Sequence, residues 1–220
     1  MWSVEQDRWS GKAPGASSVV ERRGRRTGMT TTPAGRNTER TRRAILDAAV
    51  ALVGDRGSGA SLADIAAAAG VSKSGLLHHF SSREGLLAAV GEDAATTFRQ
   101  QVLRHVDLAE NRPGKLLRAY VRALCGGSEE AMAAFSSSPA WNALAQDPSF
   151  TGVLSADNDR WNRELLADGM DHDRMTVVRR AAEGAAMAYS YGDETRESLQ
   201  RIGRVLLRLA EAGGIGETIG

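Results

Sequence analysis

Residues 61–80, SLADIAAAAGVSKSGLLHHF, constrain the fold more than any other stretch, because they predict two short helices joined by a tight corner. Apolar residues recur at helical spacing in the first half, and Gly70 can supply the left-handed backbone that ends a helix. Ser72 is a good N-cap for a second helix, in which Leu76 and Phe80 face inward one turn apart. The small Ala66 allows the two helices to approach closely. This pattern is typical of a helix-turn-helix.

The outer face of the second helix has a composition that suits nucleic acid. With Leu76 at the buried centre, Ser74 and His78 turn outward, Gly75 and Leu77 lie on the flanks, and Lys73 stands at the N-terminal end. This face holds hydroxyl, ammonium and imidazole groups and no carboxylate, which favours a helix that enters a DNA major groove. The alternative is an ordinary helical hairpin.

The residues before this motif predict an irregular tail and then another helix. Residues 1–37 lack periodicity and hold seven basic against three acidic residues, which predicts a disordered basic tail. Its arginine cluster, residues 22–26, could contact phosphates or simply be solvated. From Thr38 or Arg40 onward an amphipathic stripe predicts a helix that ends at GDRGSG; its members are Ile45, Leu46, Ala49, Leu52 and Val53.

Two serine-to-acid pairs predict helix starts. Ser61 and Asp64 form a capping pair, and a hydroxyl at such an N-terminus can also bind a DNA phosphate. Ser81 and Glu84 predict a second capping box at the start of a long helix. Arg83 lies in the first turn of that helix, where the helix dipole disfavours a cation unless a phosphate is near or the side chain is solvated.

The run RTRRAILDAAVALVGDRGSGASLADIAAAAGVSKSGLLHHFSSREGLLAAV, about fifty residues of the 220, resembles the DNA-binding domain of the TetR family of regulators. The matching features are the Ala and Gly of the corner, the Val-Ser-Lys that opens the recognition helix and the Ser-Arg-Glu that opens the next one. The resemblance implies DNA contacts from Ser61, Lys73, Ser74, Gly75, Leu77, His78, His79 and Arg83, of which His79 and Arg83 would bind phosphates.

Two positions depart from the family pattern. Many members carry Thr where this chain has Gly75 and Tyr where it has Leu77. Gly75 has no side chain, and Leu77 offers only apolar contact, for example to a thymine methyl group. Base readout is therefore expected to fall on Lys73, Ser74 and His78.

The remainder of the chain predicts helices only, so the fold class is all-α. Pro, Gly and Ser clusters divide it into segments of roughly 83–110, 114–125, 128–137, 148–167, 174–190 and 194–211. We expect a tail over residues 1–37, a helix-turn-helix DNA-binding domain over 38–85 and a helical effector-binding and dimerisation domain over 86–214. For this last part the resemblance to the family is one of segment count and length.

The last two segments have the composition of a helix interface. One carries a small-residue surface and the other a 3-4-3 apolar spacing. Two such helices from each subunit would form a four-helix dimer interface, and an intrachain core is the alternative. The expected interface residues are Ala182, Ala185, Ala186, Leu199, Ile202, Leu206 and Leu209.

Large side chains gather in the middle segments, where the family places its ligand cavity. They are Tyr120, Met132, Phe135, Trp141, Phe150, Trp161 and Met170. We expect this group to contact a small-molecule effector, with a plain hydrophobic core as the alternative.

Other classes of function lack a sequence signature. The single cysteine, Cys125, can form no intrachain disulfide, and the four histidines show no metal-binding spacing, so no metal and no cofactor is expected. No phosphate loop and no G-x-S-x-G motif occurs, so an enzyme is not expected. With no membrane span and no secretory signal, we expect a cytoplasmic protein.

These patterns together predict a homodimeric transcriptional regulator. We expect a repressor that binds a palindromic DNA operator and is released by a small-molecule ligand. One alternative is a ligand-independent architectural DNA-binding protein. Another is a helical small-molecule-binding domain whose helix-turn-helix binds protein.

Overall fold

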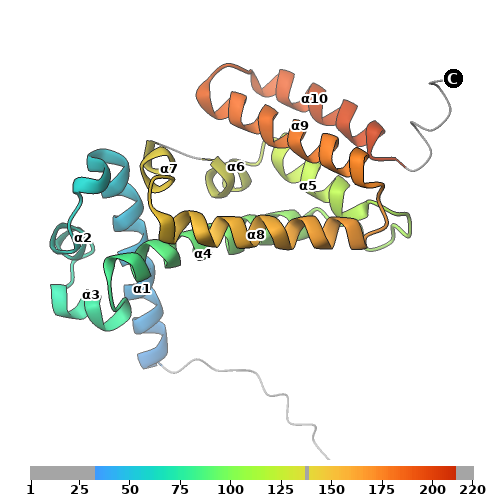
Figure 1. The fold of residues 1–220 in the computed structure, drawn as a ribbon. Coiled ribbons are helices and arrows are strands. Elements are labelled where there is room, and N and C mark those ends of the chain that lie inside the picture. The colour runs from blue at the N-terminus through green and yellow to red at the C-terminus, as the bar shows by residue number, and fades with distance from the viewer. Residues whose placement is uncertain (1–32, 137–138, 212–220) are drawn as a thin grey trace, which may run out of the picture.

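The computed structural model describes residues 33–136 and 139–211. Its described residues form α-helices joined by turns and one 3-10 turn, and the all-α expectation is confirmed. The first unit consists of α1 (Pro33–Arg56), η1 (Gly57–Gly59), α2 (Leu62–Ala68) and α3 (Lys73–His79). The second contains α4 (Arg83–Arg104), α5 (Lys115–Cys125), α6 (Glu129–Ser136), α7 (Pro139–Leu144), α8 (Pro148–Ala167), α9 (His172–Tyr191) and α10 (Arg196–Leu209). Figure 1 shows the two units at opposite ends of α4.

Side-chain caps fix most of the helix starts. Ser61, Ser72 and Thr195 each accept a hydrogen bond from a backbone N–H in the first turn of the helix that follows. The cap of α4 differs from the expectation, because Ser82 and not Ser81 accepts from the backbone of Gly85. Ser82 also lowers the pKa of Glu84, after the larger effect of the helix's own backbone N–H groups.

Three helix boundaries differ from those expected. The first helix begins at Pro33, so residues 33–37 belong to α1 and not to a tail, and proline is well suited to the first helical turn. The rest of the expected tail, including its arginine cluster, lies outside the described residues. Helix α4 ends at Arg104 instead of continuing to residue 110, and α7 occupies a stretch for which no helix was expected.

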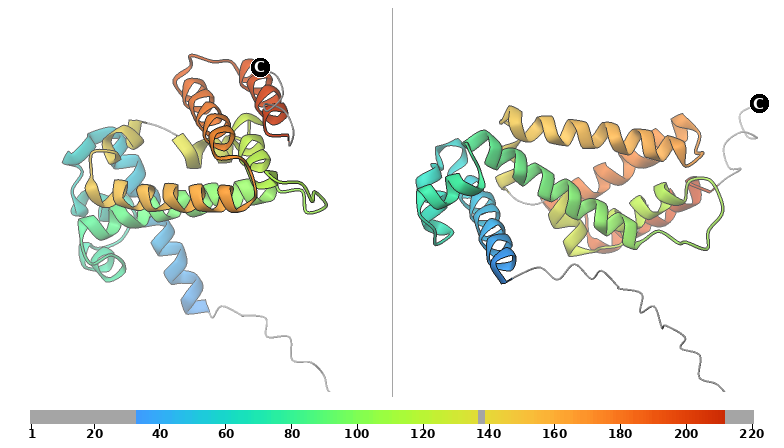
Figure 2. Two further views of the ribbon diagram at one scale, coloured as in Figure 1. Left: turned by 45° about the vertical axis from the view of Figure 1, so that its right-hand side comes forward. Right: turned by 90° about the horizontal axis from the view of Figure 1, so that it is seen from below.

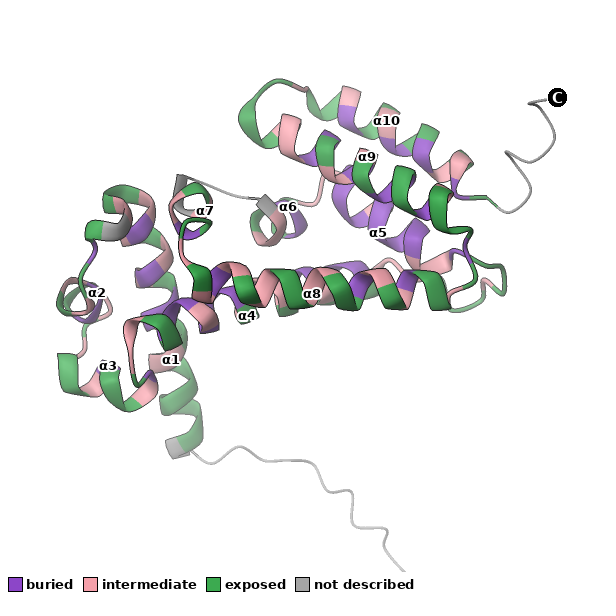
Figure 3. Cartoon of the chain, in the orientation of Figure 1, coloured by how far each residue is buried: buried purple, intermediate pink, exposed green. Residues whose placement is uncertain are grey.

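Two hydrophobic cores are joined by two long helices, α4 and α8; Phe150 of α8 lies in one core and Trp161 in the other. The first half of α4, through Leu86 and Leu87, packs into the core of the α1–α3 unit, and its second half, through Phe98 and Val102, packs into the other core. Figure 2 shows α4 running from one unit into the other. Helix α5 lies at the centre of the second unit between α4, α9 and α10, and Figure 3 shows it almost entirely buried.

The core of the first unit is completed from a distant part of the chain. Leu144 at the end of α7 and Phe150 at the start of α8 are buried in the same cluster as Ile45, Ile65 and Leu76. The helix-turn-helix unit therefore does not build its core from residues 38–85 alone. Because α7 packs along α1, a movement of α7 would be transmitted directly to α1.

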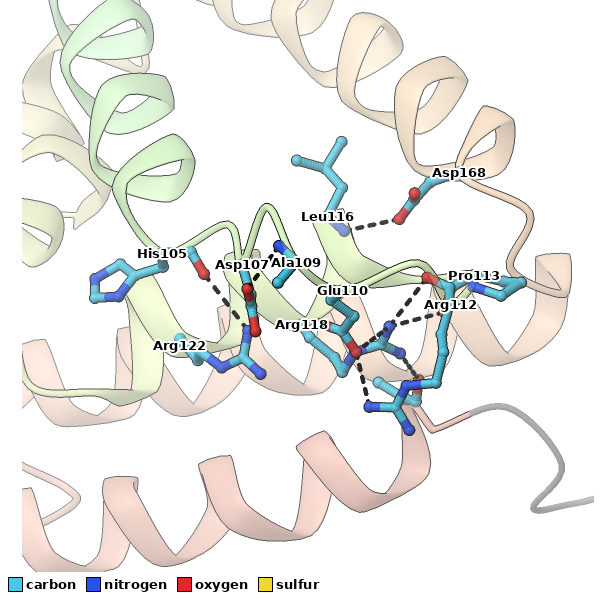
Figure 4. A network of polar contacts seen from close by, with 11 residues as sticks. His105, Asp107, Ala109, Glu110, Arg112, Pro113, Leu116, Arg118, Arg122 and Asp168 are labelled. Carbon is cyan, nitrogen blue, oxygen red and sulfur yellow. Dashed lines mark hydrogen bonds and ion pairs between the residues drawn. The ribbon is translucent and has the colours of Figure 1, made fainter.

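A buried arginine holds the other end of the second unit together. Arg118 of α5 is 2% exposed and forms an ion pair of 2.8 Å with Glu110 in the loop between α4 and α5. Its guanidinium also donates to the carbonyl oxygens of Arg112, Pro113 and Ala210 (Figure 4). Arg118 thus ties the loop and the C-terminal end of α10 to the central helix.

Candidate DNA interface and ligand cavity

The corner between α2 and α3 has the geometry that the sequence predicts. Gly70 adopts a φ of +69°, which is accessible to glycine at little cost, and the N–H of Val71 donates to the carbonyl of Ala66 at 2.9 Å. Ala66 is 1% exposed where the two helices meet. Ile65 and Leu76, both fully buried, anchor α2 and α3 on the common core. The orientation of α3 is therefore fixed by packing and not by its own short length.

The face of α3 away from this core is accessible. Lys73, Ser74, Leu77 and His78 are exposed, and Gly75 is half-buried. Ser72 Oγ accepts from the N–H of Gly75 at 3.0 Å and lies 3.0 Å from Ser74 Oγ. The four exposed side chains form one continuous surface without a carboxylate, as a helix in a major groove requires. Their contact with bases stays a prediction.

The residues expected to bind phosphate lie around this surface. Ser61 forms the expected capping box, in which the N–H of Asp64 donates to Ser61 Oγ and the N–H of Ser61 donates to Asp64 Oδ2, both at 3.2 Å. Ser61 Oγ also donates to Asp64 Oδ2 at 2.6 Å. These hydrogen bonds from Ser61 lower the pKa of Asp64. His79 is half-buried with its ring 5.9 Å from that of His78, and Arg83 is half-buried in the first turn of α4.

One basic residue beside α3 was not among the DNA contacts expected from the sequence. The guanidinium of Arg42, on α1, lies 5.3 Å from the centroid of the Phe80 ring, at the C-terminal end of α3. Arg42 precedes the first buried residue of α1, Ile45, by three positions. The helical spacing of α1 could therefore have placed Arg42 on the side that faces α3.

A cavity of about 230 Å³ lies in the second unit and is lined by residues of α4, α5, α6, α7, α8 and α9. Four of the seven expected ligand residues line it: Tyr120, Phe135, Trp141 and Trp161. The other three do not, because Met132 and Met170 are buried in the core of the second unit and Phe150 in that of the first. Phe98 lines the cavity as well, and its ring centroid lies 5.2 Å from that of Tyr120.

The polar wall of this cavity was not expected. It consists of Asp157, Asn158, Arg179, Arg180 and Glu183. The side chain of Asp157 is only 20% exposed. Arg179 is 4% exposed and donates to Glu183, Asn158 and Asn162. The sequence did not indicate that Arg179 is buried, because this helix was predicted from its small apolar residues. Its partners Asn162 and Asn158 are 17 and 21 positions away, and Glu183 lies one turn along α9.

Glu183 is the centre of this polar wall. Its carboxylate accepts from Tyr120 Oη at 2.7 Å, from Arg179 Nε at 2.8 Å and from Arg180 at 2.6 Å. Burial, and then the charge of Glu183, raise the pKa of the Tyr120 hydroxyl. Tyr120 is therefore a neutral donor, and both oxygens of the Glu183 carboxylate accept hydrogen bonds from groups of this chain.

A second cavity, of about 470 Å³, lies between the two units. Its walls come from α1, α4, α6 and α7, and they include Arg43, Asp47 and Asp93. The guanidinium of Arg43 pairs with Asp93 at 2.7 Å, which links α1 to α4. Trp141 and Ala134 line both cavities, so the two cavities share a wall.

The expected dimer interface needs correction. Ala182, Ala186 and Leu199 are fully buried inside the single chain, and Ala185 and Leu206 are at least 92% buried there. They pack with α5 in the core of the second unit, so they cannot form a contact surface for a second copy. Ile202 and Leu209 pack against this core and remain partly accessible. The intrachain alternative therefore holds for five of the seven residues.

The described ranges offer no site of two other kinds. No cluster of three or more His, Cys, Asp or Glu side chains there could bind a metal ion. None of the helices in those ranges is long and apolar enough to span a lipid bilayer. Cys125 is buried, and burial raises the pKa of its thiol to about 11.

Similar folds occur among solved structures of bacterial regulators. A TetR family transcription regulator from Marinobacter aquaeolei VT8 has a TM-score of 0.61 at 18% identity, over 79% of this chain and 97% of that one. SCO4454, a TetR-family regulator from Streptomyces coelicolor, has a TM-score of 0.58 at 21% identity, over 79% and 97%. The TetR-like regulator LfrR from Mycobacterium smegmatis, solved in complex with proflavine, has a TM-score of 0.50 at 24% identity, over 79% and 96%.

Two family models match the sequence itself. Residues 45–90 match the bacterial regulatory proteins of the tetR family, and residues 114–211 match the tetracyclin repressor-like C-terminal domain. No curated protein matches the chain. The two models cover both structural units and together more than half of the sequence. The chain therefore belongs to the TetR family of DNA-binding transcriptional regulators.

Proposed function

We propose that this protein is a homodimeric repressor that leaves a palindromic operator when a small molecule enters the cavity of about 230 Å³. The observation that carries the proposal is the shared wall of the two cavities. Trp141 lines the cavity of about 230 Å³ on one side and the second cavity, beside α1, on the other. A ligand in the first cavity thus reaches a side chain that also belongs to the environment of the DNA-binding unit.

In the proposed complex with DNA, the side chains that read the bases are Lys73, Ser74 and His78, and Leu77 is their apolar neighbour. Support comes from the exposure of these side chains on a helix whose opposite face is fully buried. Phosphate contacts fall to Ser61, His79 and Arg83, and Gly75 allows close approach of the backbone. The proposed domains span residues 38–85 and 86–214. The DNA-binding unit extends beyond the first range, because it begins at Pro33 and its core includes residues of α7 and α8.

In the proposed mechanism, α7 couples ligand binding to the DNA-binding unit. The ring of Trp141 lies 5.0 Å from that of Phe150, which is buried in the core of the first unit, and α7 packs along α1. A ligand that displaces Trp141 would shift α7 and with it the angle at which α1 presents α3. A ligand can alter operator affinity only if it binds the two arrangements unequally. LfrR was solved in complex with proflavine, a planar aromatic compound, which supports a binding site for a flat ring in a protein of this fold.

The dimer interface is reassigned to the outer face of α9 and α10. Val177, Ala181, Gly184, Ala188 and Tyr191 follow one another at three- and four-residue spacing along α9, and Val177 and Tyr191 are 61% and 60% exposed. On α10, Ile202, Val205 and Leu209 form a parallel stripe. Large exposed apolar side chains at the ends of a small-residue stripe suit close packing of a second copy.

The test is selection of DNA from a random pool with the full-length protein, followed by binding measurements. The proposal expects a palindromic consensus with half-sites about 34–36 Å apart or a near multiple. Binding to this consensus should fall steeply with salt and exceed random DNA by at least about a thousandfold. A consensus without symmetry, or equal binding to random duplexes, would rule out the proposed operator recognition.

A further inference from the structure

We infer that the effector is a flat aromatic compound of one or two rings whose polar end accepts hydrogen bonds through a carbonyl or carboxylate oxygen, and that it is not a cation. This inference rests on the proposed function, because it takes the cavity of about 230 Å³ as the effector site. That volume is below the roughly 300–1,000 Å³ typical of sites for drug-sized ligands, which limits the ligand to a small ring system.

The walls select for an aromatic ring. Five aromatic side chains line the cavity: Phe98, Tyr120, Phe135, Trp141 and Trp161. Four of their ring pairs lie with centroids 5.1–6.0 Å apart, in edge or tilted arrangements. A flat ring can extend this set of contacts in the same geometry.

Aromatic cavities often bind cationic ligands, but in this cavity two arginine side chains already lie against the aromatic rings. The guanidinium of Arg99 lies 4.1 Å from the centroid of Trp161, and that of Arg179 lies 5.4 Å from the centroid of Tyr120. A cationic ligand near these rings would meet two positive charges already in place. The aromatic walls therefore favour a ring without a cationic group.

The carboxylates of the cavity are likewise occupied. Glu183 accepts from Tyr120, Arg179 and Arg180, and Asp157 lies 3.5 Å from Arg99. An ammonium ligand near either carboxylate would compete with an arginine that is already paired there. The four charged residues of the lining, two acidic and two basic, balance formally, so no net negative charge attracts a cation.

Most of the polar groups that remain for a ligand are donors. The guanidinium of Arg179 can only donate, so Oδ1 of Asn158 faces it and the amide NH₂ of Asn158 is left on the cavity wall. Arg179 uses three of its five N–H groups for Glu183, Asn158 and Asn162. The indole N–H of Trp161 is buried without an acceptor. A ligand oxygen is the complement of such a wall.

The test compares two probes with the same ring system. 2-Naphthoate carries a carboxylate, and 2-naphthylmethylammonium carries a cation of similar size. Calorimetric titration of the full-length protein should give at least about tenfold tighter binding of naphthoate, as expected for a hydrogen bond to a charged group. Tighter binding of the ammonium probe, or no binding of either at millimolar concentration, would overturn the inference.

Two asparagines provide matched variants. Asn158 and Asn162 both accept from Arg179, but only Asn158 lines the cavity. Asn158→Asp keeps an acceptor for Arg179 and replaces the free amide donor by a negative charge, so naphthoate affinity should fall by about tenfold or more. Asn162→Asp makes the same change outside the lining and should lower the affinity by less than about threefold. Equal losses in both variants would contradict the role of the Asn158 amide.

A third variant tests the exclusion of cations. Arg99→Met should uncover the Trp161 ring and unpair Asp157, so binding of the ammonium probe should strengthen at least severalfold. An unchanged affinity for that probe would contradict the argument from Arg99. Operator release separates this inference from the proposed function: naphthoate binding without release would count against the regulatory function alone, and release by the cation only would count against the ligand class alone.

Discussion

At the scale of single residues, Arg118 connects the loop before α5 and the end of α10 to the central helix. It is buried together with its partner Glu110, whose side chain is 7% exposed. Burial acts to raise the pKa of Glu110, but hydrogen bonds and charges from Arg118 and Arg112 outweigh it, and the pKa is lowered. Removal of one partner of a buried ion pair leaves an uncompensated charge.

Glu110→Gln should therefore lower the free energy of unfolding by about 3–5 kcal/mol, measured by urea denaturation at pH 7. The control is Glu130→Gln, because Glu130 pairs with Arg104 at 3.5 Å on the surface with 73% of its side chain exposed. An exposed pair of this kind contributes at most about 1 kcal/mol. Equal effects of the two substitutions would show that the Arg118 charge is satisfied by the backbone carbonyls alone.

The pH dependence of the same pair has a definite sign. A carboxylate with a lowered pKa in the folded state stabilises the fold above its unfolded pKa, about 4.3, and loses this contribution as the pH falls through the folded value. The difference in unfolding free energy between the wild type and Glu110→Gln should be constant from pH 7 to 5 and shrink below about pH 4. A difference that grew on acidification would contradict this assignment.

Residues of the DNA interface should separate into two classes. Lys73→Ala or His78→Ala should cost about 1–3 kcal/mol on the selected operator and less on random DNA, because both side chains lie on the exposed face of α3. Arg83→Ala should weaken both and reduce the salt dependence, as expected for a phosphate contact. Fluorescence anisotropy at several salt concentrations measures these effects. Equal losses for all three variants on both duplexes would reject the division.

At the scale of elements, α7 is short but lies where the two units meet. It packs on α1, ends at the fully packed Leu144 and carries Trp141 between the two cavities. Phe135 on α6 lines only the first cavity and packs against the core of the second unit. These two aromatic residues thus line the same proposed effector site but differ in their contact with the DNA-binding unit.

Trp141→Leu should therefore weaken coupling, measured as the ratio of operator dissociation constants with and without saturating 2-naphthoate. A ratio of about 5–150 in the wild type should fall toward one in this variant. Phe135→Leu should weaken naphthoate binding but leave the ratio unchanged at saturation. If both variants kept the full ratio, coupling would have to run through α4 or α8 and not through α7.

At the scale of the whole molecule, burial within one chain decides which residues can join two chains. Gly184 and Val205 are exposed on the outer face of α9 and α10, whereas Leu206, one position further, is 4% exposed in the intrachain core. A Cβ at position 184 would meet nothing within 4 Å in the single chain. Substitutions at these positions can therefore distinguish assembly from folding.

Gly184→Glu and Val205→Glu should each shift the protein from dimer to monomer in sedimentation equilibrium, with unchanged helix content in circular dichroism, because the new charge would be buried only in the dimer. Operator affinity should fall toward that for random DNA. Leu206→Asp should instead lower the free energy of unfolding by several kcal/mol, because it buries a carboxylate inside the chain. A dimer that persisted in both glutamate variants would place the interface on another face.

The sequence by itself determined the local structure of this protein. Some features act between residues only a few positions apart: the capping serines, the glycine at the corner and the helical spacing of Ile65 and Leu76. They could therefore be recognised in the sequence without a structure. The residue types of the outer face of α3 followed from the same periodicity. The α4 cap lies one residue later than expected, because adjacent serines offer equivalent caps. The start of α1, the end of α4 and the short helix α7 also differ from the expectation.

The tertiary structure alone decided which apolar face meets which neighbour. The stripe of α10 packs inside the chain because α5 lies against it, with Cys125 next to Gly203, and no periodicity distinguishes this from a dimer interface. The polar wall around Arg179 joins α5, α8 and α9 through partners up to 63 positions apart. Trp141 acquires its place between two cavities from the packing of α7 on α1. Such contacts depend on the relative positions of whole helices, which local spacing does not encode.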